Sequence, residues 1–260
     1  VLGKKLHLNR AVVEQEIAQA EAEYAATERR VRTDVQIAFY NLLLAQRRVE
    51  VTRDLVGIAE KAVEASQTLL KAEEVGPVAV LQSQVEANMA HILLQRAENA
   101  RRGAWRRLTS VVGAPDMPLQ EVAGDIEDAA RDYDFEELFQ TLVSTSPELA
   151  AAFSATERAR WSLSRAEVEA IPNVNAQVVV QHDNATGDDV AGVQIGIPLP
   201  IFNRNQGGIQ QAVGDIVTAE QNLARIEMRL RDRLAAVFQD YADARVQVER
   251  YSAQILPQAK

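Results

Sequence analysis

The sequence has 260 residues, 47% of them apolar and 25% charged, and 37 acidic against 28 basic residues give a formal net charge of −9. This composition is that of an ordinary globular chain and excludes wholesale disorder. These 260 residues contain no cysteine, which excludes disulfide scaffolds, thiolate zinc sites and thiol nucleophiles. The acidic balance argues against nucleic acid as the main partner. No uninterrupted apolar run reaches 18 residues, so the sequence predicts no transmembrane helix.

Apolar and small residues recur at alternating spacings of three and four from about residue 9 to residue 74, which predicts one long helix. No proline interrupts this stretch, and the rhythm holds for about eight heptads, as is typical of a coiled coil. At 1.5 Å per residue, such a helix is about 100 Å long. Its apolar stripe comprises Val13, Ile17, Ala20, Tyr24, Thr27, Val31, Val35, Ala38, Leu42, Ala45, Val49, Thr52, Val56, Ala59, Val63, Ser66 and Leu70.

A second apolar stripe runs beside the first. It predicts that the helix contacts a neighbour on each side, as in a barrel of helices. An ordinary long helical bundle explains the same spacing, so the pattern alone leaves both arrangements open. The second stripe comprises Ile37, Leu44, Val51, Leu55, Ile58, Ala62, Ala65 and Leu69.

The long helix is expected to end at a tight reversal, because glycine after an apolar run, followed by proline, is a helix stop. Val75, Gly76 and Pro77 form this tip, and a second helix follows over residues 78–112. Residues 1–112 are therefore expected to form a long helical hairpin. The packing side of its second helix is assigned to Val85, Met89, Ile92, Leu93, Ala97, Ala100, Ala104, Leu108 and Val111.

Two regions of different character follow. Residues 113–147 contain prolines and many acids, with one short helix near 135–142, and are assigned as a separate equatorial region. Ser146 and Pro147 form a helix start, and residues 148–172 are assigned as a helix of about half the first one's length, ending before Pro172.

The hydrophobic period changes to two after Pro172, which predicts a β-hairpin over residues 173–200. Each run of nine or ten residues has the length that crosses a bilayer as a tilted barrel strand. A hairpin packed on the helices of a soluble protein is the alternative. The alternating apolar residues are Val174, Ala176, Val178, Val180, Val193, Ile195 and Ile197.

Residues 201–260 repeat the first long helix, which begins again after Gly207 and Gly208. This match predicts an internal duplication with an incomplete second copy. The chain is accordingly expected to be cut at both ends, with a further strand hairpin before residue 1 and a second tip after residue 260. At an offset of 199, the identical pairs are Ile17/Ile216, Ala20/Ala219, Glu21/Glu220, Glu28/Glu227, Arg32/Arg231, Phe39/Phe238, Ala45/Ala244, Val49/Val248 and Glu50/Glu249.

This order of elements resembles the TolC-type outer-membrane efflux proteins. Three segments carry the resemblance: residues 146–172, which lead into the strands; the strand exit VQIGIPLPIFNRNQGGI at 193–209; and the tip at 75–77 with its glutamine-rich continuation at 80–84. Pro77 stands where the family usually has leucine, which leaves the details of contacts at the tip open.

The resemblance implies a mainly α fold, in which long coiled-coil helices form an α-barrel and the β-hairpin belongs to a transmembrane β-barrel. It implies a homotrimer in the outer membrane of a Gram-negative-type cell, with the helical part in the periplasm and the barrel in contact with outer-membrane lipid. The function implied is a passive exit duct for substrates passed on by an inner-membrane pump and a periplasmic adaptor, which docks at Val75, Gly76 and Pro77. Gate residues would lie beyond residue 260. The barrel-to-tunnel turn is assigned to Pro198, Pro200, Phe202, Gly207 and Gly208.

No catalytic constellation is present in the sequence, and neither enzymatic activity nor a cofactor or metal site is expected. His7, His91 and His182 share no helical spacing, and His91 is interpreted as a packed or surface imidazole. A soluble coiled-coil scaffold or adhesin stalk is the alternative function. The sequence does not identify the exported substrate, whether drug, metal ion or protein.

Overall fold

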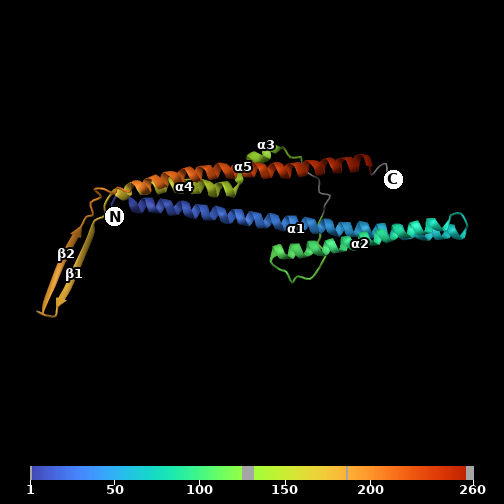
Figure 1. Cartoon of the computed structure of the whole chain (residues 1–260), viewed down its shortest axis with the longest axis horizontal. Helices are drawn as coiled ribbons and strands as arrows, with labels where there is room; N and C mark the ends of the chain where they lie inside the picture. Colours follow the sequence, from blue (N-terminus) through green and yellow to red (C-terminus); the bar gives the residue numbers. More distant parts are fainter. Residues whose placement is uncertain (1, 125–131, 186, 256–260) are drawn as a thin grey trace. The chain divides into compact units, whose positions relative to one another are not determined.

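The computed structural model describes residues 2–124, 132–185 and 187–255. The chain divides into two compact units, Glu28–Ala130 and a unit made of Val1–Thr27 with Arg131–Lys260. Long helices dominate both, and the strands form a single two-stranded hairpin within the described residues (Figure 1). The mainly α fold with one β-hairpin is confirmed.

One continuous helix, α1 (Lys5–Lys71), begins in one unit and ends in the other. In the unit Glu28–Ala130 it runs antiparallel to α2 (Pro77–Val112), as Figure 1 shows. The first apolar stripe faces this contact: Leu42 has no exposed surface, and it clusters with Ala38 of α1 and with Trp105 and Leu108 of α2. Nearer the tip, the hydroxyls of Ser66 and Ser83 meet at 2.7 Å across the two helices.

The face of α2 that contacts α1 matches the expected one only in part: Ala97 and Leu108 are buried as expected. Val85, Met89, Ile92 and Leu93 are exposed. The buried residues are mostly alanines, because small side chains let the two backbones approach closely. The buried positions of α2 are Val80, Ala87, Ala90, Ala97, Trp105, Leu108 and Thr109.

The segment after α2, residues 113–124, forms what we call the equatorial strap. Gly113 ends α2 in the left-handed conformation, with φ of 80°. The Trp105 indole donates to the carbonyl of Met117 at 3.1 Å. The Gln46 side chain both donates to the carbonyl of Val122 at 3.1 Å and accepts from its amide at 3.0 Å. These bonds tie the strap to both helices.

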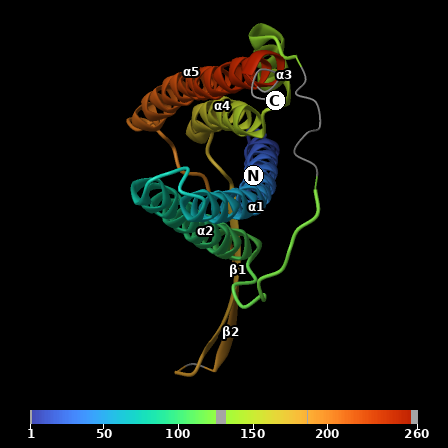
Figure 2. The same cartoon turned by 90° about the vertical axis from the view of Figure 1, so that its right-hand side faces the viewer.

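The other unit pairs α5 (Gln206–Arg250) with the shorter α4 (Pro147–Glu167), which lie side by side in Figures 1 and 2. Ser146 caps α4 by accepting from the Leu149 amide at 3.4 Å. The helix ends at Glu167, and a 3₁₀ turn (Val168–Ala170) replaces the last turn expected from the sequence. The core between the helices contains Leu149, Ala152, Ile226 and Leu230, with Leu142, Val143 and Leu223 packed against it.

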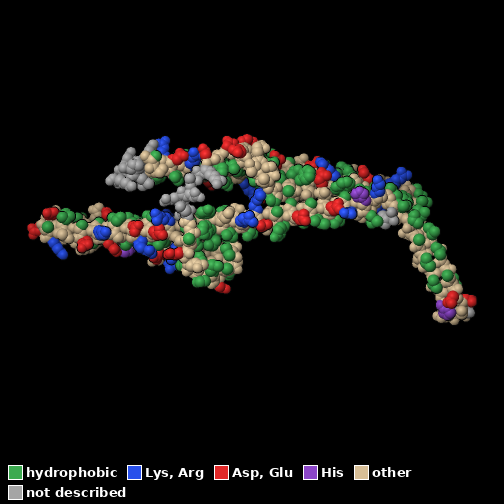
Figure 3. Space-filling view, turned by 180° about the vertical axis from the view of Figure 1, so that it is seen from behind, with side chains coloured by type: hydrophobic (Ala, Val, Ile, Leu, Met, Phe, Trp, Pro, Cys, Tyr) green, Lys and Arg blue, Asp and Glu red, His purple; other side chains and the backbone are tan. Residues whose placement is uncertain are grey.

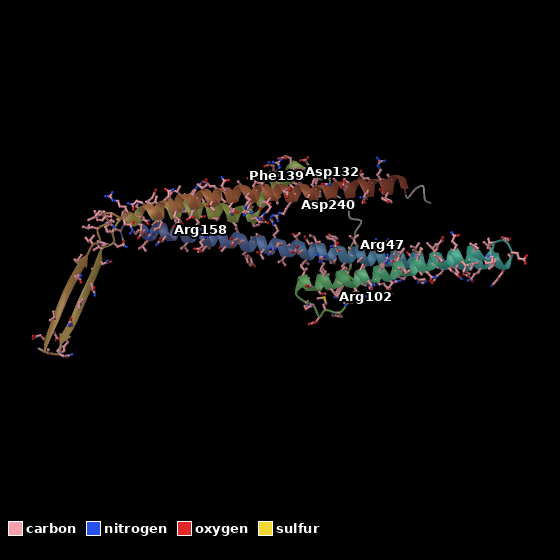
Figure 4. The ribbon with its side chains drawn as sticks, viewed as in Figure 1. Arg47, Arg102, Asp132, Phe139, Arg158 and Asp240 are labelled. Atoms are coloured by element: carbon pink, nitrogen blue, oxygen red, sulfur yellow. The ribbon has the colours of Figure 1, made fainter. Side chains whose placement is uncertain are left out.

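Aromatic rings and ion pairs attach the short helix α3 (Phe135–Thr145) to α5. The guanidinium of Arg231 lies 4.9 Å above the ring of Phe139, which is labelled in Figure 4, and Phe135 packs edge-on against Phe238. Next to α3, Glu148 accepts from Arg233 at 2.8 Å and from Arg229 at 3.1 Å. Burial alone would raise the pKa of Glu148, but the hydrogen bonds and charges of the two arginines outweigh it and hold the pKa below its ordinary value.

The exposed part of the first stripe is a second difference from expectation. Val13, Ile17, Tyr24 and Val31 of α1 are exposed in this chain, although they continue the same heptad rhythm. The expected second stripe is exposed as well, at Ile37, Leu44, Val51, Leu55, Ile58 and Leu69. Over these residues α1 therefore presents apolar side chains that are exposed in the described structure.

Candidate membrane hairpin and helical tip

The strands β1 (Asn175–Asp183) and β2 (Asp188–Gly196) pair antiparallel, with Val178 opposite Val193. Val174 and Ile197, which the sequence placed in the strands, lie one residue outside them. Gly187 adopts a φ of 77° in the turn that joins the strands, a conformation that glycine adopts without strain. The hairpin is thus nine residues long on each side.

Opposite residues of an antiparallel pair share a face, so the register separates the side chains into two sets. One face carries an unbroken apolar ladder: Ala176, Val178 and Val180 from β1, opposite Ile195, Val193 and Ala191 from β2. Val178 and Val193 are each 73% exposed. Figure 3 shows hydrophobic side chains along the hairpin and charged ones at its far end.

The opposite face is polar over most of its length. It carries Asn175, Gln177, Val179 and Gln181 from β1, opposite Gly196, Gln194, Gly192 and Val190 from β2. No Lys, Arg, Asp or Glu interrupts this set between residues 175–181 and 190–196. The hairpin is therefore an amphipathic ribbon with one apolar and one uncharged polar face.

The far end of the hairpin is acidic. His182 and Asp189 lie opposite each other, with Nδ1 of His182 at 2.7 Å from a carboxylate oxygen of Asp189. Asp183 lies opposite Asp188 in the next pair. The charged groups are confined to the turn and to its adjoining pairs, which leaves the middle of both strands without charge.

The segment after β2 is the predicted barrel-to-tunnel turn. Pro198 and Pro200 bracket Leu199, whose carbonyl accepts from the Ile201 amide at 3.0 Å, and Phe202 is 90% exposed. Proline has no amide hydrogen, so this segment cannot extend the strand pairing on its own. The apolar exposed surface nevertheless continues past the strand.

Gly207 and Gly208 lie in the first turn of α5, which begins at Gln206, rather than before the helix as expected. A Cβ at Gly208 would collide with the side chain of Asn205, whereas Gly207 has open space around it. Asn205 starts α5 in the left-handed conformation, with φ of 63°, and its side-chain amide donates to the carbonyl of Ala166 at 2.9 Å. Asn205 therefore joins the start of α5 to the end of α4, a role that nothing in the local sequence pattern indicated.

The helical tip is shaped by a residue that sequence reasoning missed. α1 ends at Lys71, and Glu73 has a φ of 62°, the left-handed conformation that closes a helix. Gly76 has a φ of −80°, which any residue adopts, so this turn does not require glycine there. Pro77 is the first residue of α2, and the neighbouring Val78 and Leu81 are exposed.

A buried lysine anchors the N-terminal end of α1 near the strands. Lys5 is only 3% exposed, and its ammonium group lies 3.6 Å from the Glu169 carboxylate and 3.4 Å from the Glu169 carbonyl oxygen. Arg165 pairs with the same carboxylate and donates to the Asn9 side chain at 2.7 Å. Arg165 lowers the pKa of Glu169, with a smaller contribution from Lys5.

The two tryptophans have different surroundings. Trp105 is buried against Ala38 and Leu42 of α1, whereas Trp161 on α4 is partly exposed. Arg101 lies 3.8 Å from Glu121, and Arg102 donates to Asn99 on its own helix. Among the residues with described positions, no three or more His, Cys, Asp or Glu gather into a metal-binding group. None of the described helices is long and apolar enough to span a membrane.

Comparison with known proteins gives one curated relative and several solved structures. The cobalt-zinc-cadmium resistance protein CzcC of Cupriavidus metallidurans is 27% identical over 257 residues, which cover 98% of this chain and 60% of CzcC. The outer-membrane protein VceC of Vibrio cholerae matches with a TM-score of 0.76 at 19% identity, over 98% of this chain and 64% of VceC. The outer-membrane channel CmeC of Campylobacter jejuni matches with a TM-score of 0.67 at 14% identity, over 97% of this chain and 60% of CmeC.

No family model matches the chain. The chain spans about 60% of the length of the curated relative that it resembles. The names of these proteins describe metal resistance, an outer-membrane protein and an outer-membrane channel.

Proposed function

We propose that this chain, which shares the fold of outer-membrane channels and 27% identity with CzcC, is a TolC-type protein and forms part of an outer-membrane exit duct. In this proposal the hairpin contributes to a β-barrel in the outer membrane, and the long helices contribute to a periplasmic tunnel. Substrates pass through without chemistry, and the protein is not an enzyme.

The two faces of the β-hairpin carry the proposal. Nine residues at about 3.3 Å each give strands of about 30 Å, enough to cross the apolar band of roughly 25 Å that barrel strands span when tilted. The apolar ladder of Ala176, Val178, Val180, Ala191, Val193 and Ile195 is the face for lipid. The glutamine-bearing face is the one for a water-filled lumen.

The unpaired edges of the hairpin also support a place in a closed β-barrel. In the described structure each strand has one partner, so each leaves one side of its backbone hydrogen-bonding groups unpaired. Unpaired backbone groups are costly in lipid, and a closed barrel removes them. Strands from other copies of the chain, or from other parts of it, would complete the barrel.

The exposed stripe of α1 supports an assembly around a tunnel. Leu44, Val51 and Ile58 are exposed one heptad apart, on a helix whose first stripe already packs against α2. A helix with two apolar stripes has a neighbour on each side. We propose that the second neighbour belongs to another copy of the chain in a homotrimer.

The partners and the cargo belong to the same proposal. A periplasmic adaptor would dock at the tip formed by Val75, Gly76 and Pro77, and an inner-membrane pump would supply the substrate. Cobalt, zinc and cadmium ions are the cargo to test first, because CzcC is named for resistance to them. The exposed apolar ladder gives no support to a soluble scaffold, which would cover such a surface.

Cysteine accessibility tests the proposal directly, since the chain has no cysteine of its own in these 260 residues. Single cysteines at Gln177, Gln181 and Gln194 would probe the lumen face, and cysteines at Val178 and Val193 would probe the lipid face. In outer-membrane vesicles, a charged thiol reagent should label the first set and spare the second. A lipid-soluble maleimide should label the second set.

The two sets provide their own control, because they alternate along the same strands and differ only in the face. Equal labelling of both sets by the charged reagent would show a hairpin surrounded by water and would refute the membrane assignment. Protection of both sets would place the hairpin in a protein interior.

A further inference from the structure

We propose that a pocket between α1 and α2 binds a divalent transition-metal ion through His91 and Glu60. The pocket has a volume of about 290 Å³ and is open to solvent. Glu60 and Val63 of α1 line it together with Gln84, Ala87, Asn88 and His91 of α2. It lies within the unit Glu28–Ala130, which does not include the hairpin strands.

The distance between the two strongest ligands fits a metal ion. Nε2 of His91 lies 3.2 Å from a carboxylate oxygen of Glu60. Two ligand atoms that are each about 2.0–2.1 Å from a zinc ion lie roughly 3.3 Å apart at a tetrahedral angle and roughly 2.9 Å apart at a right angle. A cation can therefore enter between these two atoms without a large movement of either helix.

The chemistry of the lining favours a cation of intermediate softness. Imidazole nitrogen combined with carboxylate oxygen suits zinc, cobalt and nickel better than magnesium or calcium. Asn88 and Gln84 precede His91 by three and seven residues, so all three lie along one face of α2. Asn88, one turn from His91, is the amide placed to complete the site directly or through water, whereas Gln84 is about two turns away.

The charge of the pocket also favours a cation. Glu60 is the one carboxylate among the residues that line this pocket, and no lysine or arginine lines it to neutralise the charge. Alanine and valine form the rest of the lining. With two strong protein ligands, the site would exchange its ion readily rather than hold it as a permanent structural centre.

A simple surface ion pair is the competing explanation. His91 and Glu60 side chains are 50% and 60% exposed, and pairs this exposed contribute little to stability. A metal site would bind an added transition-metal ion through His91 and Glu60, whereas a simple ion pair would not. A metal titration therefore distinguishes the two explanations. The metal site does not depend on the proposed duct function, since the ligands, distance and pocket belong to the helical hairpin alone.

Cobalt(II) titration of the purified full chain in detergent tests the inference, with visible absorption reporting coordination and calorimetry reporting affinity. The wild type should bind one Co²⁺ at this site, and zinc should displace it. His91→Ala and Glu60→Gln should each weaken binding by about tenfold or more, since even partners that only support a ligand are worth about 10- to 100-fold in metal affinity.

The other two histidines of the sequence give matched controls. His7→Ala and His182→Ala should leave the Co²⁺ affinity unchanged, although the second removes a comparable His–Asp pair. His91→Cys retains a metal ligand and should still bind zinc, which separates ligation from any effect of the substitution on folding. Binding that is unchanged in His91→Ala, or that is lost in His182→Ala instead, would overturn the inference.

Discussion

Replacing Gln46 with alanine will release the equatorial strap, because the Gln46 amide both donates to and accepts from the backbone of Val122. The Gln46 side chain bonds to both the amide and the carbonyl of Val122, as a neighbouring β-strand would. No strand pairs with the strap at Val122 within the described residues. Each partly buried hydrogen bond contributes roughly 1 kcal/mol net. Loss of two should raise the opening equilibrium of the strap by about 30-fold, at a tenfold change per 1.4 kcal/mol.

Amide hydrogen exchange of the peptide that contains Val122 measures this opening. Gln46→Ala should speed its exchange by about 30-fold, on the two-bond count above. Exchange in α1 and α2 should stay unchanged, because the core around Leu42 and Trp105 is intact. Gln46→Glu should give an intermediate increase, since it keeps the oxygen that accepts from the Val122 amide but loses the donor to the carbonyl.

Gln82→Ala is the matched control, because its side chain donates to Glu86 on the same helix and does not reach the strap. This variant should leave exchange at Val122 as in the wild type. If Gln46→Ala also leaves it unchanged, then other contacts, such as the Trp105 indole bond to Met117, hold the strap, and the reasoning from Gln46 is refuted.

Two further predictions concern stability. Leu42→Ala should lower the free energy of unfolding by about 2–5 kcal/mol, because this side chain is fully buried. Leu44 is 52% exposed, so Leu44→Ala should lower the free energy of unfolding by less than about 1 kcal/mol in the unassembled chain. Equal losses for the two variants in chemical denaturation would contradict the assignment of the two stripes. Glu148→Gln should destabilise the unit of α4 and α5 at neutral pH by removing the charge that Arg229 and Arg233 bind. Because the folded-state pKa of Glu148 is lowered, this contribution is present above the ordinary pKa of 4.5 and is lost as the pH falls through the folded value. Melting curves of the wild type and Glu148→Gln should therefore converge in acid, and a constant difference across that range would count against the clamp.

The regular elements could be predicted from the sequence because their signals are periodic and local. The heptad rhythm located α1, and Ser146 with Pro147 marked the start of α4. The alternation located both strands, but at the turn they extend further than its apolar residues, to Asp183 and from Asp188. The face of α2 could not be predicted from hydrophobicity, since the sequence favours Val85 and Met89 over the small Ala87 and Ala90. Closely packed helices require small side chains at their contact, and the hydrophobicity of a residue does not report its size.

The contacts between residues far apart in the chain could not be predicted from the sequence either. Gln46 and Val122 are 76 residues apart, and Lys5 and Glu169 are 164 apart, so no local pattern links them. Glu73, rather than the glycine three residues later, adopts the left-handed conformation at the tip, against the usual preference for glycine. The pairing of His91 with Glu60 arises only because α1 and α2 run antiparallel.

The alternating faces of the hairpin limit how its strands can change in length during evolution. Every second side chain from Ala176 to Val180 points to the same face, so a single inserted or deleted residue would exchange the two faces over the rest of that strand. Valines would then replace glutamines on the polar face, and glutamines would replace valines on the apolar one. Insertions and deletions of two residues preserve the faces, as does a change confined to the turn around Gly187. Related hairpins should therefore differ in strand length by even numbers, with odd differences taken up in the turn or in a bulge.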